Sequence, residues 1–465
     1  MASTKPARGM RDFLPADVRK RNYVIGVIKE VYESYGFEPL ETPAVENIET
    51  LMGKYGDEGN QLVFKILKRG EKLDLANAKI ESDLSDLALR YDLTVPLARV
   101  VANNKNELPK FFKRYQIQPV WRADRPARGR FREFYQCDVD AIGSESMVVE
   151  SELISAVSSI LKRLGFEDFL VKLNHRDLLA GLLEISGVPD RFIPETITIL
   201  DKLDKIGVDG CLKEIGSFGF GLDGIQNFTS FIAETFQKRE QILKESGPHD
   251  ANQSTINQLA QFVANSSSGR TGLSAVGTLM TILDDSGNGS KLWLDPFLAR
   301  GLSYYTGTIL EIVLTKGDFK GSLGGGGRYD GLIGMFGKEQ IPACGFSLGL
   351  ERILVVMEER GMFPPEIAES RAADVMVTIW DEASIVDSLN LARELRKQGI
   401  RVTVYPEPDK LGKQFKYADS TGIPFVCVLG DEERAAKKVK LKNMLSGEEC
   451  TLKAPEIAAK IVSAA

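Results

Sequence analysis

The sequence predicts a mixed α/β protein with an α+β core and two or three domains. Three features predict this fold class: amphipathic helical segments near the start of the chain, an extended hairpin at 111–142, and short β-rich runs that alternate with helical patterns after residue 373. The chain has 465 residues, 43% of them hydrophobic, which is enough for several cores if domains hold roughly 100–200 residues each.

Two long amphipathic helices are predicted in the first 165 residues. Apolar residues recur at the helical period over 17–35, where Gly36 supplies a C-terminal stop, and again over 147–164. The segment between Phe37 and Glu46 is predicted to be extended. Its two prolines favour an edge or interface strand over a central one.

Composition divides the chain into candidate domains. A core over 1–360 is interrupted by 176–290, where helical patterns and polar tracts predict a mainly helical insertion. Residues 361–373 contain two adjacent prolines and are predicted to be a linker. Beyond them, 374–465 are predicted to form a small α/β domain.

The charge pattern points to one local site. The chain carries a formal charge of −6, so a nucleic-acid role cannot rest on bulk charge. Eight basic residues nevertheless stand between positions 110 and 132 against one acid, Asp124, a local charge of +7, which predicts a phosphate site: Lys110, Lys113, Arg114, Arg122, Arg125, Arg128, Arg130 and Arg132. A solvated basic surface is the alternative.

Other classes are disfavoured by what the sequence lacks. The five cysteines are far apart with no C-x-x-C pair, and there are two histidines, so neither a structural zinc site nor a disulfide framework is predicted. No apolar run approaches the ~18 residues that cross a bilayer, and the start of the sequence has no secretory signal. We therefore expect a cytoplasmic protein without a membrane partner.

The segment 111–142 is the most informative part of the sequence. Two extended runs flank a turn at 123–129, which predicts a hairpin with a basic tip. Alternation along the second strand predicts one face that carries cations, an aromatic ring, an amide and carboxylates: Arg130, Arg132, Phe134, Gln136, Asp138 and Asp140. Such a face suits a ligand with a triphosphate, a flat base and an ammonium, or else a structural ion-pair ladder.

Two later segments carry further candidate ligand groups. Arg300 stands close to Tyr304 and Tyr305 and offers a phosphate partner beside ring walls, although tyrosine pairs are also common packing residues. A glycine run at 324–327 permits close backbone approach but is not a P-loop, which disfavours a Walker-type ATPase. Arg352 is predicted in the first turn of a helix, where a bound anion best explains a cation.

These segments, in this order, resemble those of the class II aminoacyl-tRNA synthetases, and most closely the histidyl members. The resemblance covers most of the chain. Residues 36–43 are similar to the first class motif, 121–134 to the second, with Asp124 where glutamate is commoner, and 349–352 to the third. Neither H-I-G-H nor K-M-S-K-S, the marks of the other class, occurs. The resemblance implies an antiparallel sheet flanked by helices and a C-terminal anticodon-binding domain.

Four segments resemble the histidyl members specifically: 9–15, 90–96, 135–140 and 300–307. The resemblance implies groups that hold the ammonium and imidazole of L-histidine, namely Asp92, Thr94, Gln136 and Asp140. It implies aromatic pocket walls at Tyr304, Tyr305 and Tyr329. Departures from the family pattern occur at Met10, where threonine is usual, and at Ser303, where many members carry an acid.

The resemblance also implies ATP as a substrate and Mg²⁺ as its companion ion. The implied catalytic residues are Arg122, Arg300 and Arg352, which hold the phosphates, while Phe134 stacks on adenine beside Arg130. The implied reaction forms histidyl-adenylate and transfers histidine to the 3′ end of tRNA(His), releasing pyrophosphate and AMP. The implied assembly is a homodimer. Helically spaced lysines in the last domain fit either phosphate contacts or a solvated face: Lys410, Lys413 and Lys416.

Two rival functions are considered. The first is a synthetase-like paralogue that binds histidine as a non-catalytic regulatory subunit; the segment 374–465 and the retained Arg300 and Arg352 argue against it. The second is a class II synthetase for proline, threonine or glycine, from which the segment 300–307 separates this chain.

Overall fold

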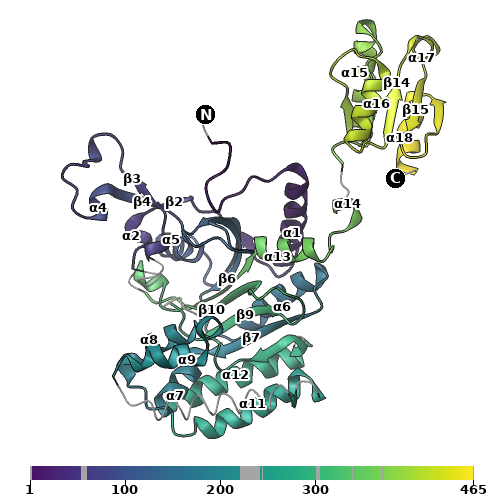
Figure 1. Ribbon diagram of the computed structural model, residues 1–465. Helices are drawn as coiled ribbons and strands as arrows, with labels where there is room; N and C mark the ends of the chain where they lie inside the picture. The colour runs from purple at the N-terminus through teal and green to yellow at the C-terminus, as the bar shows by residue number, and fades with distance from the viewer. Residues whose placement is uncertain are drawn as a thin grey trace. The chain divides into compact units, whose positions relative to one another are not determined.

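The computed structural model describes residues 3–53, 60–219, 241–242, 245–287, 289–299, 304–337, 339–368 and 371–463 (Figure 1). The chain forms two compact units, Met1–Phe363 and Pro364–Ala465. The boundary between the units lies inside the segment 361–373. Each unit has hydrophobic cores of its own.

The first unit is built on an eight-stranded sheet with the order β1-β5-β6-β11-β10-β9-β7-β8. The six central strands pair antiparallel, and only the two edge strands join in parallel. In chain order the strands are β1 (Glu38–Pro39), β5 (Phe112–Trp121), β6 (Glu133–Ile142), β7 (Phe169–His175), β8 (Leu292–Leu294), β9 (Thr308–Leu314), β10 (Gly324–Arg328) and β11 (Ala343–Gly349). The predicted antiparallel sheet, the hairpin and the edge position of the proline-containing strand are confirmed.

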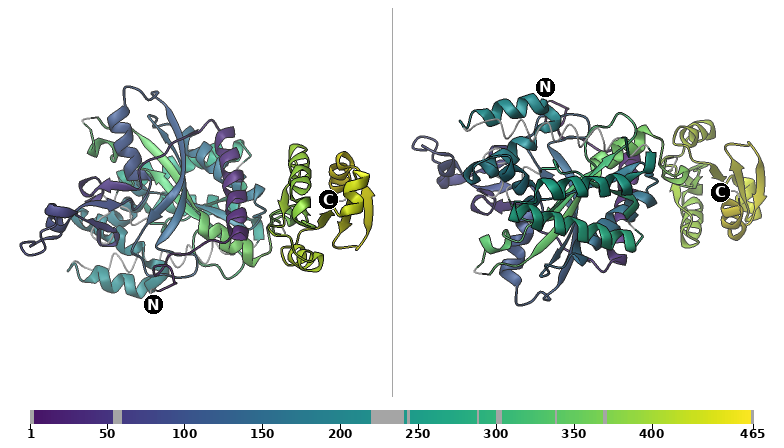
Figure 2. Two further views of the ribbon diagram at one scale, coloured as in Figure 1. Left: turned by 90° about the horizontal axis from the view of Figure 1, so that it is seen from above. Right: turned by 90° about the horizontal axis from the view of Figure 1, so that it is seen from below.

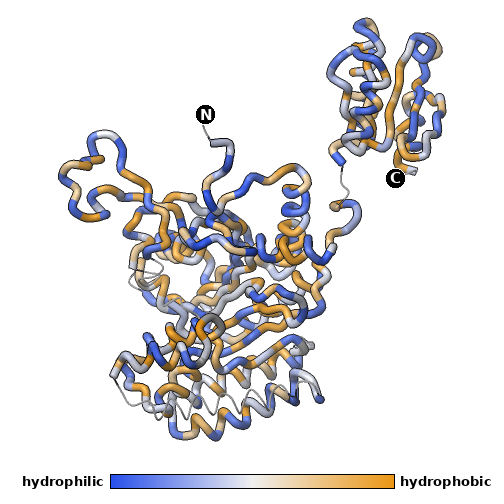
Figure 3. Tube along the Cα trace, viewed as in Figure 1, coloured by the Kyte–Doolittle hydropathy of each residue, from blue (hydrophilic) through white to orange (hydrophobic). Residues whose placement is uncertain are grey.

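Three helices pack over the central strands on the apolar face of this sheet, namely α1 (Pro15–Ser34), α6 (Val148–Arg163) and α13 (Leu350–Glu359), and a helix of the later segment 267–285 packs over β7. Pro15 occupies the first turn of α1, two residues before the predicted start, and Gly36 follows the helix with φ 77°. Apolar side chains of β5, β6 and β11 pack with these helices in one large core. Coloured by hydropathy, the helices carry bands of both kinds, as expected of elements with one buried face (Figure 3).

The first unit also contains a smaller three-stranded sheet, with the order β2-β4-β3. Its strands are β2 (Val45–Asn47), β3 (Lys65–Leu67) and β4 (Ser85–Leu89), accompanied by α2 (Ile48–Leu51), η1 (Gly70–Lys72) and α4 (Glu81–Leu84). The helix α5 (Thr94–Asn104) and the short η4 (Ile333–Met335) pack nearby. A second core joins this region to three tyrosines of the later segments: Tyr304, Tyr305 and Tyr329.

The chain between β7 and β8 is helical where it is described. It contains α7 (Arg176–Ile185), η2 (Asp190–Phe192), α8 (Ile193–Leu200), α9 (Leu203–Gly216), α11 (Pro248–Phe262), α12 (Ser267–Asp285) and η3 (Gly289–Lys291). These helices gather on one side of the sheet, and α11 and α12 lie in front of it when the unit is seen from below (Figure 2). Because β7 and β8 are parallel neighbours, the helical segment leaves the sheet and returns to it at one edge.

The second unit holds a mixed five-stranded sheet with the order β13-β12-β14-β15-β16. The first three of these pair in parallel and the last two antiparallel. The strands are β12 (Val375–Val377), β13 (Val402–Val404), β14 (Phe425–Val428), β15 (Val439–Asn443) and β16 (Glu449–Leu452). The helical elements are α14 (Pro365–Ala368), η5 (Glu382–Ser384), α15 (Ile385–Lys397), α16 (Leu411–Ser420), α17 (Asp431–Ala436) and α18 (Ala454–Ser463).

Within the described ranges, no helix has both the length and the apolar character needed to span a membrane. All five cysteines are described, and none forms a disulfide.

Candidate active site

Strand β6 separates the core from a polar face. Cys137 and Val139 point into the large core, whereas Gln136, Asp138 and Asp140 lie on the opposite face and are nevertheless buried. The expected alternation is correct from Phe134 onward but wrong for Arg130 and Arg132. These two arginines precede the strand, and Arg130 exchanges backbone hydrogen bonds with Ala127 in the tip of the hairpin.

The register of β5 and β6 places a buried guanidinium among the carboxylates. Arg114 lies opposite Asp140, and its Nη2 is 2.9 Å from Asp140 Oδ2 and 4.0 Å from Asp138 Oδ2. Burial raises the pKa of Asp138 to about 7 against the opposing effect of Arg114, and it also raises the pKa of Asp140. One cation against two carboxylates leaves room for a cationic ligand.

Three members of the predicted phosphate patch are engaged by groups of the protein itself. Arg114 is fully buried in the carboxylate cluster, and the Lys113 ammonium is bound by Glu152 at 2.9 Å and by the carbonyl of Tyr35. Arg128 in the hairpin tip pairs with Glu359 of α13. For Lys113 and Arg114 the reason is their place in strand β5, where neighbouring residues point to opposite faces of the sheet.

Asp92 is held at the start of α5. Its Oδ1 accepts a hydrogen bond from the amide of Val95 at 3.0 Å, and its Oδ2 accepts one from Tyr304 Oη at 3.4 Å. The Asp92 side chain is buried, and the neighbouring Thr94 hydrogen-bonds the same tyrosine. Asp92 and Thr94, two of the predicted site residues, therefore lie against Tyr304.

The three predicted tyrosines are brought together. The ring centroids of Tyr304 and Tyr305 are 5.0 Å apart, and those of Tyr304 and Tyr329 are 6.1 Å apart at an edge-on angle of 72°. Tyr329 Oη donates to Asp140 Oδ1 at 2.5 Å. Burial raises the pKa of Tyr304 and Tyr329, so both phenols stay protonated and can donate.

Two buried oxygens on this face accept no hydrogen bond from the described residues: Gln136 Oε1 and Asp140 Oδ2. The Gln136 amide nitrogen, by contrast, donates to Ser347 Oγ at 2.9 Å and to Asp138 Oδ1 at 3.4 Å. Arg114 reaches Asp140 Oδ2 as an ion pair without hydrogen-bond geometry. Buried acceptors are normally satisfied, so these two point to a donor-bearing ligand.

Arg122 and Phe134 lie at the end of the hairpin nearest its tip. Arg122 Nε donates to the carbonyl of Tyr91 at 3.0 Å, and its guanidinium lies 4.3 Å from the centroid of the Tyr91 ring and 5.2 Å from that of Phe134. Phe134 is half-buried and Arg130 is exposed. A ring and two cations are thus available to a planar, anionic ligand.

Arg352 stands in the first turn of α13, as predicted. Its Nη1 donates to the carbonyl of Ser322 at 2.7 Å and to Ser322 Oγ at 3.0 Å. A Cβ atom on Gly129, in the hairpin tip, would lie 3.3 Å from Arg352 Cγ, so this helix end and the hairpin tip are in contact. Arg300 and Ser303 lie outside the described residues.

A buried ion pair fixes α13 to the hairpin. Arg21 of α1 bonds Glu351 at 2.9 Å, and the other oxygen of Glu351 accepts from the backbone amide of Tyr135 at 2.9 Å. Burial raises the pKa of Glu351, against the opposing effect of Arg21. The pair sits one residue from Arg352 and holds that arginine beside β6.

The glycine run forms strand β10 and is needed by its neighbours. A Cβ on Gly326 would lie 2.1 Å from the carbonyl oxygen of Gly345, and one on Gly327 would lie 3.0 Å from the Tyr305 ring. The glycine backbone thus packs closely against other parts of the protein. One of these is Tyr305, a predicted wall of the pocket.

The lysines of the second unit lie at the start of α16 and are exposed. Lys410 precedes the helix, Lys413 pairs with Asp409 at 2.8 Å, and Lys416 lies one turn further on.

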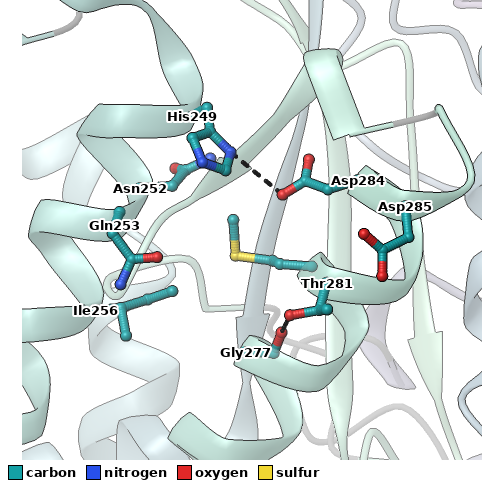
Figure 4. A pocket seen from close by; sticks show the side chains of 9 residues that line it. His249, Asn252, Gln253, Ile256, Gly277, Thr281, Asp284 and Asp285 are labelled. Atoms are coloured by element: carbon teal, nitrogen blue, oxygen red, sulfur yellow. Dashed lines mark hydrogen bonds and ion pairs between the residues drawn. The ribbon is translucent and has the colours of Figure 1, made fainter.

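A groove of about 380 Å³ between α11 and α12 is a separate feature (Figure 4). His249 Nδ1 lies 3.3 Å from Asp284 Oδ2 at its rim, and Asp285, Thr281 and Met280 also line it. None of the predicted site residues lines this groove.

Sequence reasoning missed three residues that shape the site. The charge pattern assigns Arg114 to the phosphate patch, and no motif gives Ser347 or Tyr91 a role, although Ser347 accepts a hydrogen bond from Gln136 and the carbonyl of Tyr91 accepts one from Arg122. The signal for Ser347 lay in the segment 344–352, where it alternates with Gly345 and Gly349, but its partner depends on a register between distant strands.

Comparisons with known proteins cover the whole chain. Residues 9–353 match the family described as Histidyl-tRNA synthetase, and 374–464 match that described as Anticodon binding domain. The chain is 43% identical over 460 residues to the histidine--tRNA ligase of Christiangramia forsetii, covering 96% of each chain. It is 42% identical to that of Porphyromonas gingivalis, covering 98% of each.

A solved structure shares the fold over the full length. The crystal structure of histidyl-tRNA synthetase from Nostoc sp. PCC 7120 superimposes with a TM-score of 0.78 at 31% sequence identity, covering 100% of both chains. The chain therefore belongs to the histidyl-tRNA synthetase family of class II aminoacyl-tRNA synthetases, the ligases that charge tRNA(His) with histidine.

Proposed function

We propose that this chain activates L-histidine with ATP to histidyl-adenylate and transfers the histidyl group to the 3′ end of tRNA(His), releasing pyrophosphate and then AMP. The observation that carries the proposal is the pair of buried acceptors, Gln136 Oε1 and Asp140 Oδ2, on one polar face beside three tyrosine rings. Histidine supplies a donor for each acceptor, one from its ammonium and one from its ring.

The amino acid is held by groups from three distant parts of the chain. Asp140, which Tyr329 already hydrogen-bonds, takes the imidazole N–H, and Tyr304 and Tyr305 wall the ring. The ammonium is taken by the remaining groups, namely Asp92, Thr94 and the Gln136 oxygen. A site that must satisfy its own buried polar atoms rejects amino acids without matching donors, which is the basis of selectivity here.

Activation is a displacement at the α-phosphorus. A histidine carboxylate oxygen attacks that phosphorus, the bond from phosphorus to the oxygen bridging to the β-phosphate breaks, and pyrophosphate leaves with the electron pair. The nucleophile is already ionised, so catalysis consists of positioning and charge stabilisation. Arg122 and Arg300 act on the α-phosphate and Arg352 on the γ-phosphate, while Phe134 stacks on adenine beside Arg130.

Mg²⁺ enters the proposal as the companion of ATP. Among the described residues no group of three His, Cys, Asp or Glu side chains is placed to hold a metal. A Mg²⁺ ion carried by phosphates needs only one or two protein carboxylates. Across four neighbouring strands, the directly opposite residues are Asp138, Ser347, Gly325 and Glu311. Glu311 therefore lies on the same polar face of the sheet as Asp138. It is half-buried there and would hold the ion. When bound, Mg²⁺ neutralises phosphate charge.

The transfer step and assembly complete the proposal. The basic hairpin tip 125–129 meets the acceptor end of the tRNA. The core spans 1–360 with the helical insertion at 176–290, the linker is 361–373, and 374–465 bind the anticodon.

The chain acts as a homodimer through 36–43, whose strand β1 is a sheet edge. Because its substrates are tRNA and ATP, we place it in the cytoplasm.

Histidine-dependent exchange of pyrophosphate into ATP tests the activation step. We expect exchange with histidine and none with proline, threonine or glycine. Arg300→Ala should slow exchange by ~100–1000-fold while ATP affinity changes far less, the usual cost of losing one group that stabilises transition-state charge. Exchange that is absent with histidine, or unaltered in Arg300→Ala, contradicts the proposal.

A further inference from the structure

The amide of Gln136 is held in one orientation. Its nitrogen has two acceptors, Ser347 Oγ at 2.9 Å and Asp138 Oδ1 at 3.4 Å, whereas its oxygen is buried and accepts no hydrogen bond from the described residues. An amide flipped by 180° would bring its oxygen against a carboxylate. The observed orientation instead turns the acceptor toward the ligand face.

Ser347 transmits this preference because a hydroxyl has a single proton. Ser347 lies directly opposite Asp138 in the β6–β11 register, and the two side chains share a hydrogen bond that lowers the pKa of the Asp138 carboxyl. An ionised carboxylate only accepts, so the Ser347 proton is committed to Asp138. The lone pairs of Ser347 Oγ then face Gln136, which must present its NH₂ group.

Asp138 is itself held by the buried cluster. Arg114 Nη2 lies 4.0 Å from its Oδ2, and Arg114 is anchored by Asp140 at 2.9 Å and by the carbonyl of Leu93 at 3.3 Å. Burial raises the pKa of Asp138 to about 7 against the lowering effects of Arg114 and Ser347, so at pH 8 the carboxyl is mostly ionised and acts as an acceptor.

We propose that Asp138 and Ser347 are positioning residues that lock the Gln136 amide with its oxygen toward the α-ammonium of the substrate, so that selection for the amino group depends on two side chains that act through Gln136. The inference rests on the proposed function, which places the ammonium at Gln136. It assigns a role to Asp138, which the activation chemistry does not use.

Two ligands that differ only in the amino group test the inference. L-histidine and imidazolepropionate share the ring and the carboxylate, and only histidine carries the ammonium. Their dissociation constants, measured by calorimetry at pH 8 with the full-length protein, give an amino-group preference for each variant. Imidazolepropionate binding also reports whether the ring end of the pocket remains folded.

We expect Ser347→Ala and Asp138→Asn each to weaken histidine binding by about 10-fold to 100-fold, the range for losing one hydrogen bond to a charged group. Imidazolepropionate binding should change by no more than about twofold on the same grounds, since that ligand makes no such bond. In pyrophosphate exchange the loss should appear in the KM for histidine rather than in that for ATP. Ser347→Thr keeps the hydroxyl and should restore the preference.

An unchanged amino-group preference in both variants overturns the inference. Equal weakening of both ligands does so as well, because it indicates a general structural role. These outcomes differ from failure of the proposed function, in which the unaltered chain itself would show no histidine-dependent exchange.

Discussion

A missing side chain at Gly345 leaves room for the Asp140 carboxylate. A Cβ there would lie 1.9 Å from Asp140 Oδ1, closer than any real contact, so Gly345→Ala must displace that carboxylate. We expect the KM for histidine in pyrophosphate exchange to rise by ~10-fold or more, the cost of disturbing one charged partner. Gly412→Ala, which meets nothing within 4 Å, is the matched control and should leave this KM unaltered. Equal KM values in the two variants would show that Asp140 does not bind the substrate.

Asp138 also makes stability depend on pH. Its pKa rises from 3.8 to about 7 on burial, so between these values the folded state binds a proton that the unfolded state has released. This contribution to the free energy of unfolding is fully present below pH 4 and is lost as pH rises toward 7. The difference in unfolding free energy, unaltered protein minus Asp138→Asn, should therefore fall across pH 4 to 7 in urea titrations. A difference that rises would contradict the raised pKa.

Among the elements, those with repeated local signals were predictable from the sequence. The helices α1 and α6 and the hairpin β5–β6 follow hydrophobic periods that many residues share. Arg114 was not predictable in this way. Its place among basic neighbours resembled a phosphate patch, and only the register of β5 against β6 sets it opposite Asp140. The hydrogen bond between Gln136 and Ser347 likewise depends on the pairing of β6 with β11, two strands that are far apart in the sequence.

The crossing of α7 and α12 depends on glycine. A Cβ on Gly181 would lie 2.4 Å from the Cα atom of Gly269, and backbone cannot give way as a flexible side chain can. We expect Gly181→Ala to lower the free energy of unfolding by ~1–3 kcal/mol, the usual cost of overpacking. Gly277→Ala, also in α12 but with nothing within 4 Å, should be neutral or stabilising by up to about 1 kcal/mol. Urea titrations of both variants measure this, and equal stabilities would contradict the close crossing.

At the scale of the whole molecule, the two units have separate hydrophobic cores. All predicted adenylate-forming residues that are described lie in Met1–Phe363. A chain ending at Phe363 should therefore keep histidine-dependent pyrophosphate exchange. Its kcat/KM for tRNA charging should fall by ~100-fold or more, because linked binding modules commonly gain that much in combined affinity. Loss of exchange in the truncated chain would place part of the activation site in the second unit.

The pairing of β7 with β8 has a consequence for how this molecule is assembled. Leu173 lies beside Leu294, so a contact at the edge of the sheet joins residues that are 121 positions apart in the sequence. Bringing such distant points together costs chain entropy, and the three residues of β8 offset little of that cost. The intervening helices must first bring the two strands close, so we expect β7 and β8 to pair late in folding. Until they pair, the backbone groups at the edge of β7 stay exposed and can pair with a strand of another newly synthesised chain.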